Sequence, residues 1–100
     1  MKRKRKPTTP GEILDEEFLA PLGISQSGLA RHIGCDVKVI NRIVNEKSRV
    51  TPEMALKFAE CFETTPDFWL NAQMAVDLWK APLSKRIPSL LKKRKRKMFS

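Results

Sequence analysis

The fold is decided by residues 26–45, which read QSGLARHIGCDVKVINRIVN. Ala30 places a small side chain midway along a first short helix, where a second helix has to cross closely. Gly34 follows four positions later and tolerates the positive φ of a turn after that helix. Apolar residues fall where the two helices face each other, namely Leu29, Ile33, Ile40 and Ile43. Residues 26–45 therefore predict a helix-turn-helix.

Capping residues mark the starts of five helices along the chain. They are Thr9, Ser25, Asp36, Thr51 and Thr65, and three of them precede a proline at the first helical position. The residues expected to face inward are Ile13, Leu14, Phe18 and Leu19 in the first helix and Ala55, Phe58, Ala59 and Phe62 in the fourth. The fifth helix is expected to run to about Lys80, and no strand pattern appears. The sequence thus predicts an all-α fold, a bundle of five short helices.

Positive charge is concentrated at the two ends of the chain. The net charge is +9, yet residues 2–6 carry five positive charges, residues 92–97 carry six, and residues 7–91 have a net charge of −2. We therefore expect a basic N-terminal tail at residues 1–7, a helix-turn-helix domain with a C-terminal dimerisation helix at residues 8–80, and a basic C-terminal tail at residues 81–100. Both tails are expected to be disordered.

Several classes of protein are disfavoured by what the chain lacks. Cys35 and Cys61 occupy positions for small apolar residues, so we expect no disulfide, and with one histidine there is no metal-ligand set. His32 is expected to be structural or solvent-facing. Neither a signal peptide nor a membrane span is apparent, which predicts a cytoplasmic location. No catalytic residue set and no cofactor motif is recognised, so an enzyme is not expected.

The fifth helix carries apolar residues on more than one face. A helix in a domain this small cannot be surrounded by its own core, so part of its surface is expected to meet a second copy of the chain. The predicted dimer contacts are Phe68, Trp69, Ala72, Val76 and Trp79. The alternative is a tightly packed terminal helix with two half-exposed tryptophans.

The third helix carries the side chains best suited to contact DNA. Ile40, Ile43 and Val44 are taken by the core, which leaves polar residues facing outward. The predicted base-reading set is Val37, Lys38, Asn41, Arg42 and Asn45. Lysine and arginine donate to guanine, asparagine pairs with adenine, and a valine methyl can meet that of thymine. A solvated polar face without a ligand is the alternative.

Backbone contacts to DNA are expected on either side of this face. Gln26 and Ser27, at the start of the second helix, are placed to contact phosphate, and Lys47 and Arg49 in the loop after the third helix are further candidates. The two basic tails would add affinity that does not depend on sequence.

Asp15, Glu16 and Glu17 form an acidic cluster on the first helix. It is either a solvated face or a site for a basic partner protein.

Several runs resemble one family, the HigA-type or VapI-type antitoxins of the Xre-like helix-turn-helix group. They are residues 10–14, 23–26, 40–45, 51–56 and 66–71, which read PGEIL, GISQ, INRIVN, TPEMAL and PDFWLN. Together they extend over about residues 8–80. The resemblance implies a lambda-repressor-like DNA-binding fold. Two departures are visible: Glu46 stands where the family usually has glycine, and Gly28 stands where a better helix former is usual.

The resemblance also implies a function. It implies a homodimer that binds a palindromic operator in its own promoter and represses transcription. The same protein would also neutralise a partner toxin that cleaves messenger RNA. Two other hypotheses stay open at this point. One is a solitary Xre-type repressor without a toxin, and the other is a basic protein that coats nucleic acid through its tails.

Overall fold

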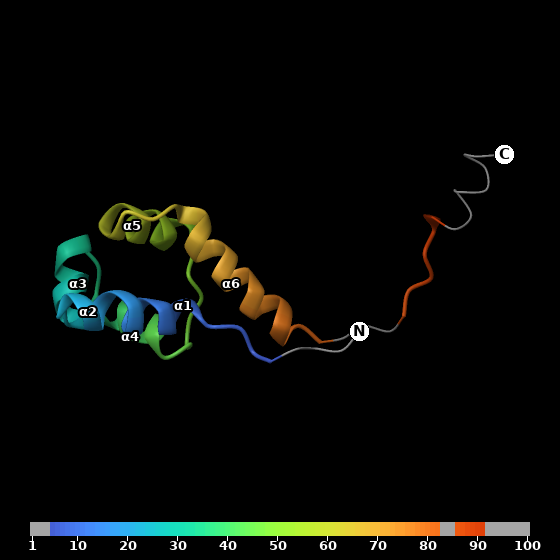
Figure 1. The fold of residues 1–100 in the computed structure, drawn as a ribbon, viewed down its shortest axis with the longest axis horizontal. Helices are drawn as coiled ribbons and strands as arrows, with labels where there is room; N and C mark the ends of the chain where they lie inside the picture. Colours follow the sequence, from blue (N-terminus) through green and yellow to red (C-terminus); the bar gives the residue numbers. More distant parts are fainter. Residues whose placement is uncertain (1–4, 83–85, 92–100) are drawn as a thin grey trace.

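The computed structural model describes residues 5–82 and 86–91, and within these ranges the chain forms five helices and no strand (Figure 1). The first helix is continuous over α1 (Pro10–Glu12), η1 (Ile13–Leu19) and α2 (Ala20–Leu22), and its middle segment takes the wider π-helical turn. The others are α3 (Gln26–Ile33), α4 (Val37–Val44), α5 (Pro52–Phe62) and α6 (Pro66–Lys80). The predicted all-α bundle is confirmed. Disorder is expected of the tails at residues 1–7 and 81–100, and of these residues 1–4, 83–85 and 92–100 lie outside the described residues.

Side-chain caps begin each of the five helices, as the sequence predicts. Thr9 Oγ1 accepts from the Glu12 backbone N–H at 3.0 Å, and the Glu12 carboxylate accepts from the Thr9 N–H at 3.2 Å, which completes the capping box. Ser25 accepts from the Gly28 N–H at 2.9 Å and Asp36 from the Lys38 N–H at 2.8 Å. Thr51 and Thr65 cap α5 and α6 in the same way. These bonds satisfy backbone donors that the first turn leaves free.

One apolar core joins all five helices. Its fully buried members include Leu14, Leu29, Ile40, Phe58 and Trp69, one from each helix. The rings of Phe58 and Trp69 lie 4.9 Å apart between centroids, which is within the range for favourable aromatic pairs. Phe18 and Phe62 are half-buried against this core. Within the described ranges, no helix combines the length and the apolar character that crossing a bilayer requires.

The last helix lies at the end of the molecule opposite α3 (Figure 1). It packs on α5 and touches α1. Trp69, Gln73 and Val76, spaced four and three residues apart, form its buried face. The Trp69 indole N–H donates to Thr64 Oγ1 at 2.8 Å, so its polar atom is satisfied inside the monomer.

This orientation corrects part of the predicted dimer contact. Trp69 is 0% exposed and Val76 is 3% exposed, so both are covered by the chain's own core and have no surface for a second copy. Ala72 is half-buried and packs against the core, while Phe68 is exposed and Trp79 is half-buried. The apolar residues that the helix leaves outside include Met74 and Leu78. A helix with apolar residues on more than one face gives only a weak sequence signal for which side is buried, and tertiary packing decides it.

Gly11 joins the start of the first helix to the end of α4. A Cβ atom at this position would lie 2.2 Å from the Ile43 carbonyl oxygen and 2.8 Å from the Val44 Cα. Both obstacles are backbone atoms of α4, which cannot rotate away. Only glycine therefore allows the two helices to approach this closely.

We expect Gly11→Ala to lower the free energy of unfolding by about 2 kcal/mol or more, because the added methyl group forces α1 and α4 apart. Chemical denaturation followed by circular dichroism measures this change. Gly28→Ala is the matched control, since a Cβ there would meet only the Ser25 Oγ at 3.2 Å and the Ile24 Cγ2 at 3.4 Å. Equal stability of the two variants would contradict the close-approach explanation.

Candidate nucleic-acid interface

The turn between α3 and α4 has the geometry that the sequence predicts. Gly34 ends α3 with φ +76°, and its N–H donates to the Ala30 carbonyl. Ala30 is 2% exposed at the crossing of the two helices. The Asp36 cap then starts α4 in a new direction. The predicted helix-turn-helix is confirmed.

One side of α4 is buried and the other faces solvent. Ile40 and Ile43 are buried, and Val39 and Val44 pack against the core beside them. The five residues predicted to read bases are all exposed: Val37, Lys38, Asn41, Arg42 and Asn45. At 100° per residue they share one face, with Lys38 and Asn45 near its centre. The predicted exposure of this face is confirmed, and the role in base reading stays a prediction.

A hydrogen bond links the start of α3 to this face. Asn41 Nδ2 donates to Gln26 Oε1 at 3.2 Å, so the two predicted DNA contacts lie side by side. The bond uses one N–H of Asn41 and leaves its Oδ1 and second N–H, which are the groups that adenine pairs with. Ser27, the next residue of α3, is exposed. The pair therefore holds the Asn41 amide in a defined orientation before any ligand binds.

A shallow hollow adjoins the same face of α4. Lys38 and Arg42, one helical turn apart, line it together with Asp36, Val39 and Ser48. The two cationic side chains and the hydroxyl group are suited to contact a phosphate, and the Asp36 carboxylate, which accepts from the Lys38 backbone N–H, offsets part of their charge. Ser48 was not predicted from the sequence, because its loop brings it back toward Arg42 through a backbone bond from Lys47 N–H to the Arg42 carbonyl at 2.7 Å.

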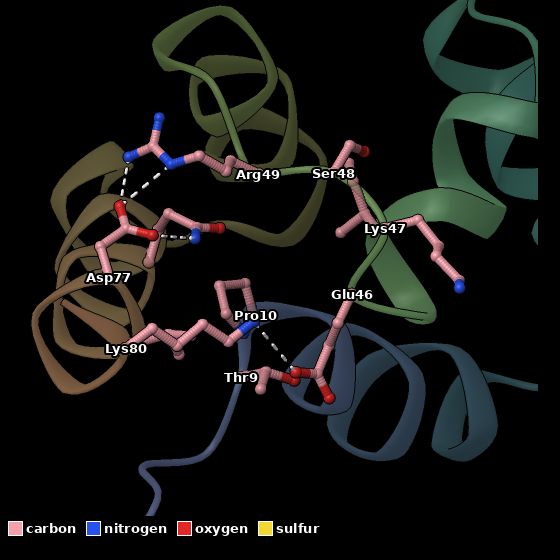
Figure 2. A pocket seen from close by; sticks show the side chains of 11 residues that line it. Thr9, Pro10, Glu46, Lys47, Ser48, Arg49, Asp77 and Lys80 are labelled. Atoms are coloured by element: carbon pink, nitrogen blue, oxygen red, sulfur yellow. Dashed lines mark hydrogen bonds and ion pairs between the residues drawn. The ribbon is translucent and has the colours of Figure 1, made fainter. Parts of the chain in front are cut away.

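The loop after α4 turns through Glu46, which has φ +59° (Figure 2). Glu46, which stands where the family usually has glycine, therefore takes a left-handed conformation that a non-glycine residue rarely adopts. Its carboxylate accepts from Lys6 Nζ at 2.6 Å and lies 3.9 Å from Lys80 Nζ. The acid is directed at the N-terminal segment and the end of α6, and both partners are cations.

Arg49 is directed toward α6 (Figure 2). Its Nε donates to Asp77 Oδ2 at 3.0 Å, and its Nη2 contacts the same oxygen. These hydrogen bonds hold the pKa of Asp77 below its ordinary value and raise that of Arg49. The predicted phosphate contact by Arg49 is not supported, because its guanidinium is engaged on the far side of the loop. Lys47 is exposed and extends away from this pair, so its predicted role stays open.

Gln73 completes the attachment of the loop to α6. Its Oε1 accepts from the buried Val50 N–H at 2.9 Å, and its Nε2 donates to Asp77 Oδ1 at 3.0 Å. The sequence contains one clue to this role, since Gln73 falls four residues after Trp69 on an otherwise apolar face. A buried glutamine on such a face requires polar partners.

Groups that could bind metals or act as nucleophiles are sparse near this surface. Among the described residues, no cluster of three His, Cys, Asp or Glu side chains is close enough to hold a metal ion. Cys35 and Cys61 are free thiols, and burial raises the pKa of each. What the site presents is exposed hydrogen-bonding and cationic side chains.

We expect Glu46→Gly to be more stable than Glu46→Ala by about 1 kcal/mol, since alanine keeps the left-handed strain and glycine removes it. Both variants lose the contacts with Lys6 and Lys80, so the difference between their stabilities reports the cost of the left-handed backbone conformation at position 46. Thermal unfolding of the two variants and the parent chain measures it. Equal midpoints for the two variants would show that the turn does not store this strain.

Comparison with known proteins shows the family to which this chain is related. The helix-turn-helix family (HTH_3) matches residues 16–69. A helix-turn-helix transcriptional regulator of Haemophilus influenzae is 49% identical over 87% of this chain and 81% of its own length. The antitoxin HigA-1 of Vibrio cholerae is 42% identical over 78% of this chain and 73% of its own.

A solved structure shows the same fold with DNA. The structure of the Pseudomonas aeruginosa antitoxin HigA with the higBA promoter has a TM-score of 0.71 and 37% identity, and covers 73% of this chain and 79% of that one. With α3 and α4 arranged as described and relatives of this similarity, the chain belongs to the Xre-like helix-turn-helix family that includes the HigA antitoxins.

Proposed function

We propose that this protein is a sequence-specific DNA-binding antitoxin. It binds a palindromic operator in its own promoter, represses transcription of its operon, and neutralises a partner toxin that cleaves messenger RNA. The observation that carries the DNA-binding half is the single exposed face of α4, on which base-reading side chains are grouped and Asn41 is held by Gln26. The toxin-binding half is supported by 42% identity to the antitoxin HigA-1.

DNA recognition divides between two groups of residues. Lys38, Asn41, Arg42 and Asn45, with Val37 at the edge, lie in the major groove and contact base edges. Gln26 and Ser27 at the start of α3, together with Lys47, contact the phosphates beside it. The body of the chain is mildly acidic, so charge alone cannot attach this face to DNA. Specific contacts are required for the α4 face to bind.

Homodimerisation supplies the second half of a palindrome. The outward face of α6 carries Met74 and Leu78, which are 64% and 76% exposed, with Ala75 beside them. Phe68 and Trp79 flank this face. Contact between two such faces about a two-fold axis forms a symmetric dimer, and reading a palindrome requires its two α4 helices to lie about 34 Å apart, which is one turn of DNA. In such a dimer, the exposed apolar residues of this face are buried in both chains.

The DNA-binding proposal is tested by fluorescence anisotropy with the gene's own upstream DNA and a scrambled duplex of equal length. Measurements at low and near-physiological salt, with and without residues 1–5 and 92–100, separate the contribution of the tails. We expect a preference for the upstream duplex that survives removal of the tails. Equal affinity for both duplexes, lost with salt and with the tails, would contradict the proposal.

Asn41→Ala combined with Arg42→Ala is expected to remove most of the preference for the operator. Each base contact contributes about 1–3 kcal/mol of discrimination, so the two together account for a factor of about 30 or more. The matched control is Arg31→Ala combined with Glu53→Ala, which truncates two exposed polar side chains outside α4 and outside the outward face of α6. Retained preference in the first variant would exclude α4 as the reading helix.

Leu78→Glu is expected to yield monomers where the parent chain is a dimer, because a carboxylate would face its symmetry mate in an apolar contact. Light scattering coupled to size-exclusion chromatography measures the mass. Leu56→Glu, at an exposed leucine of α5, serves as the control. A dimer that tolerates Leu78→Glu would place the interface elsewhere.

A further inference from the structure

A third surface lies away from both the α4 face and the outward face of α6. Three adjoining hollows run between the end of α2, the length of α3 and the last turns of α5, and all three are lined by Cys61. We call this surface the α2–α5 groove. Its apolar floor includes Leu22, Ile24 and Phe62. No residue predicted to contact DNA lines it.

The floor of the α2–α5 groove exposes adjoining apolar side chains. Leu22 is 58% exposed and Ile24 is 37% exposed, and they line the same hollow. Single exposed leucines are common on proteins. Here they adjoin one another and the half-buried Phe62, so that a partner entering the groove would remove a continuous apolar area from water.

The rim of the α2–α5 groove is acidic. Glu17, Glu60 and Glu63 line it and form no ion pair with another described residue, while Lys57 lines the same hollow as Glu60 and pairs with Glu53. The carboxylates on the other side of the molecule differ, because Glu46 and Asp77 each pair with cations of the same chain. Three carboxylates against one ammonium group make the rim net negative, so it repels nucleic acid while it attracts a cationic protein.

The proposed toxin has the complementary character. A protein that cleaves messenger RNA has to bind a polyanion, and it therefore presents lysine and arginine side chains around its RNA site. An acidic rim with an apolar floor matches a contact element in which apolar residues are flanked by such cations. A toxin segment bound in the groove would also be unable to contact RNA.

We propose that the α2–α5 groove is the docking surface for the partner toxin, with Leu22 and Ile24 as the apolar contact and Glu17, Glu60 and Glu63 as the charged contact. The inference rests on the proposed antitoxin function and adds the surface and chemistry of the contact. Because the groove shares no residue with the α4 reading face or with Met74 and Leu78, the chain can hold toxin, DNA and a second copy simultaneously.

The test uses the full chain and the small protein encoded by the gene adjacent to its own, co-expressed with an affinity tag. Leu22→Asp is the first variant, and Leu56→Asp is its control with nearly equal exposure, 59% against 58%. Glu17→Lys combined with Glu60→Lys is the second, and Glu16→Lys is its control on the same helix. Titration calorimetry measures toxin affinity, and anisotropy measures operator affinity.

We expect Leu22→Asp to weaken toxin binding at least about tenfold, because a charge replaces a contact at the centre of the apolar floor. The double charge reversal should slow association and flatten the salt dependence of toxin binding. Both controls should bind toxin as the parent chain does, and every variant should keep its operator affinity. That pattern would support the α2–α5 groove as the toxin site.

Three results would overturn the inference, and they are distinguishable. Unchanged toxin affinity in both groove variants would place the toxin elsewhere while leaving the proposed function intact. A change in the mass of the free protein caused by Leu22→Asp would show that the groove binds a second copy. Failure of the parent chain to bind the adjacent gene product, with operator binding intact, would remove the toxin half of the proposed function and this inference with it.

Discussion

The contact between Gly11 and the last turn of α4 is the constraint on which the rest of the structure depends. It brings the start of the first helix against the Ile43 and Val44 backbone, so the end of α4 is held by backbone packing as well as by side chains. The N-terminal segment consequently leaves the body beside the loop that follows α4, where Lys6 meets Glu46. Gln73 and Asp77 attach the same loop to α6. Helix α4 is thereby fixed at both ends, by the Asp36 cap and turn at one and by this junction at the other.

Much of this architecture could be predicted from the sequence because its determinants are local. The caps at Thr9, Ser25 and Thr65 act on backbone groups within three residues, so their positions set the helix starts without reference to the fold. The exposed face of α4 was also predictable, because its apolar residues occupy one side only. The π-helical turn of Ile13–Leu19 carries no such signal.

The parts that sequence reasoning placed wrongly depend on distant partners. Arg49 looks like a phosphate ligand in the sequence, but Asp77, 28 positions away, engages it. Trp69 and Val76 look like interface residues because α6 carries apolar residues on more than one face, and only packing on α5 and α1 determines which side is buried. The α2–α5 groove was invisible for a similar reason, since its lining comes from three separate helices. Its acidic rim was anticipated in part, through Glu17 in the cluster at residues 15–17.

The two sides of α6 have a consequence for how the protein behaves at low abundance. Trp69 and Val76 belong to the core of the chain, while Met74 and Leu78 on the opposite side are exposed. With the second copy bound as proposed, folding and association are linked by mass action, so the melting temperature rises with protein concentration. A chain diluted below the dissociation constant would lose the second reading helix and part of its resistance to unfolding together. Scarcity alone would then relieve repression of the operon, without any inducer.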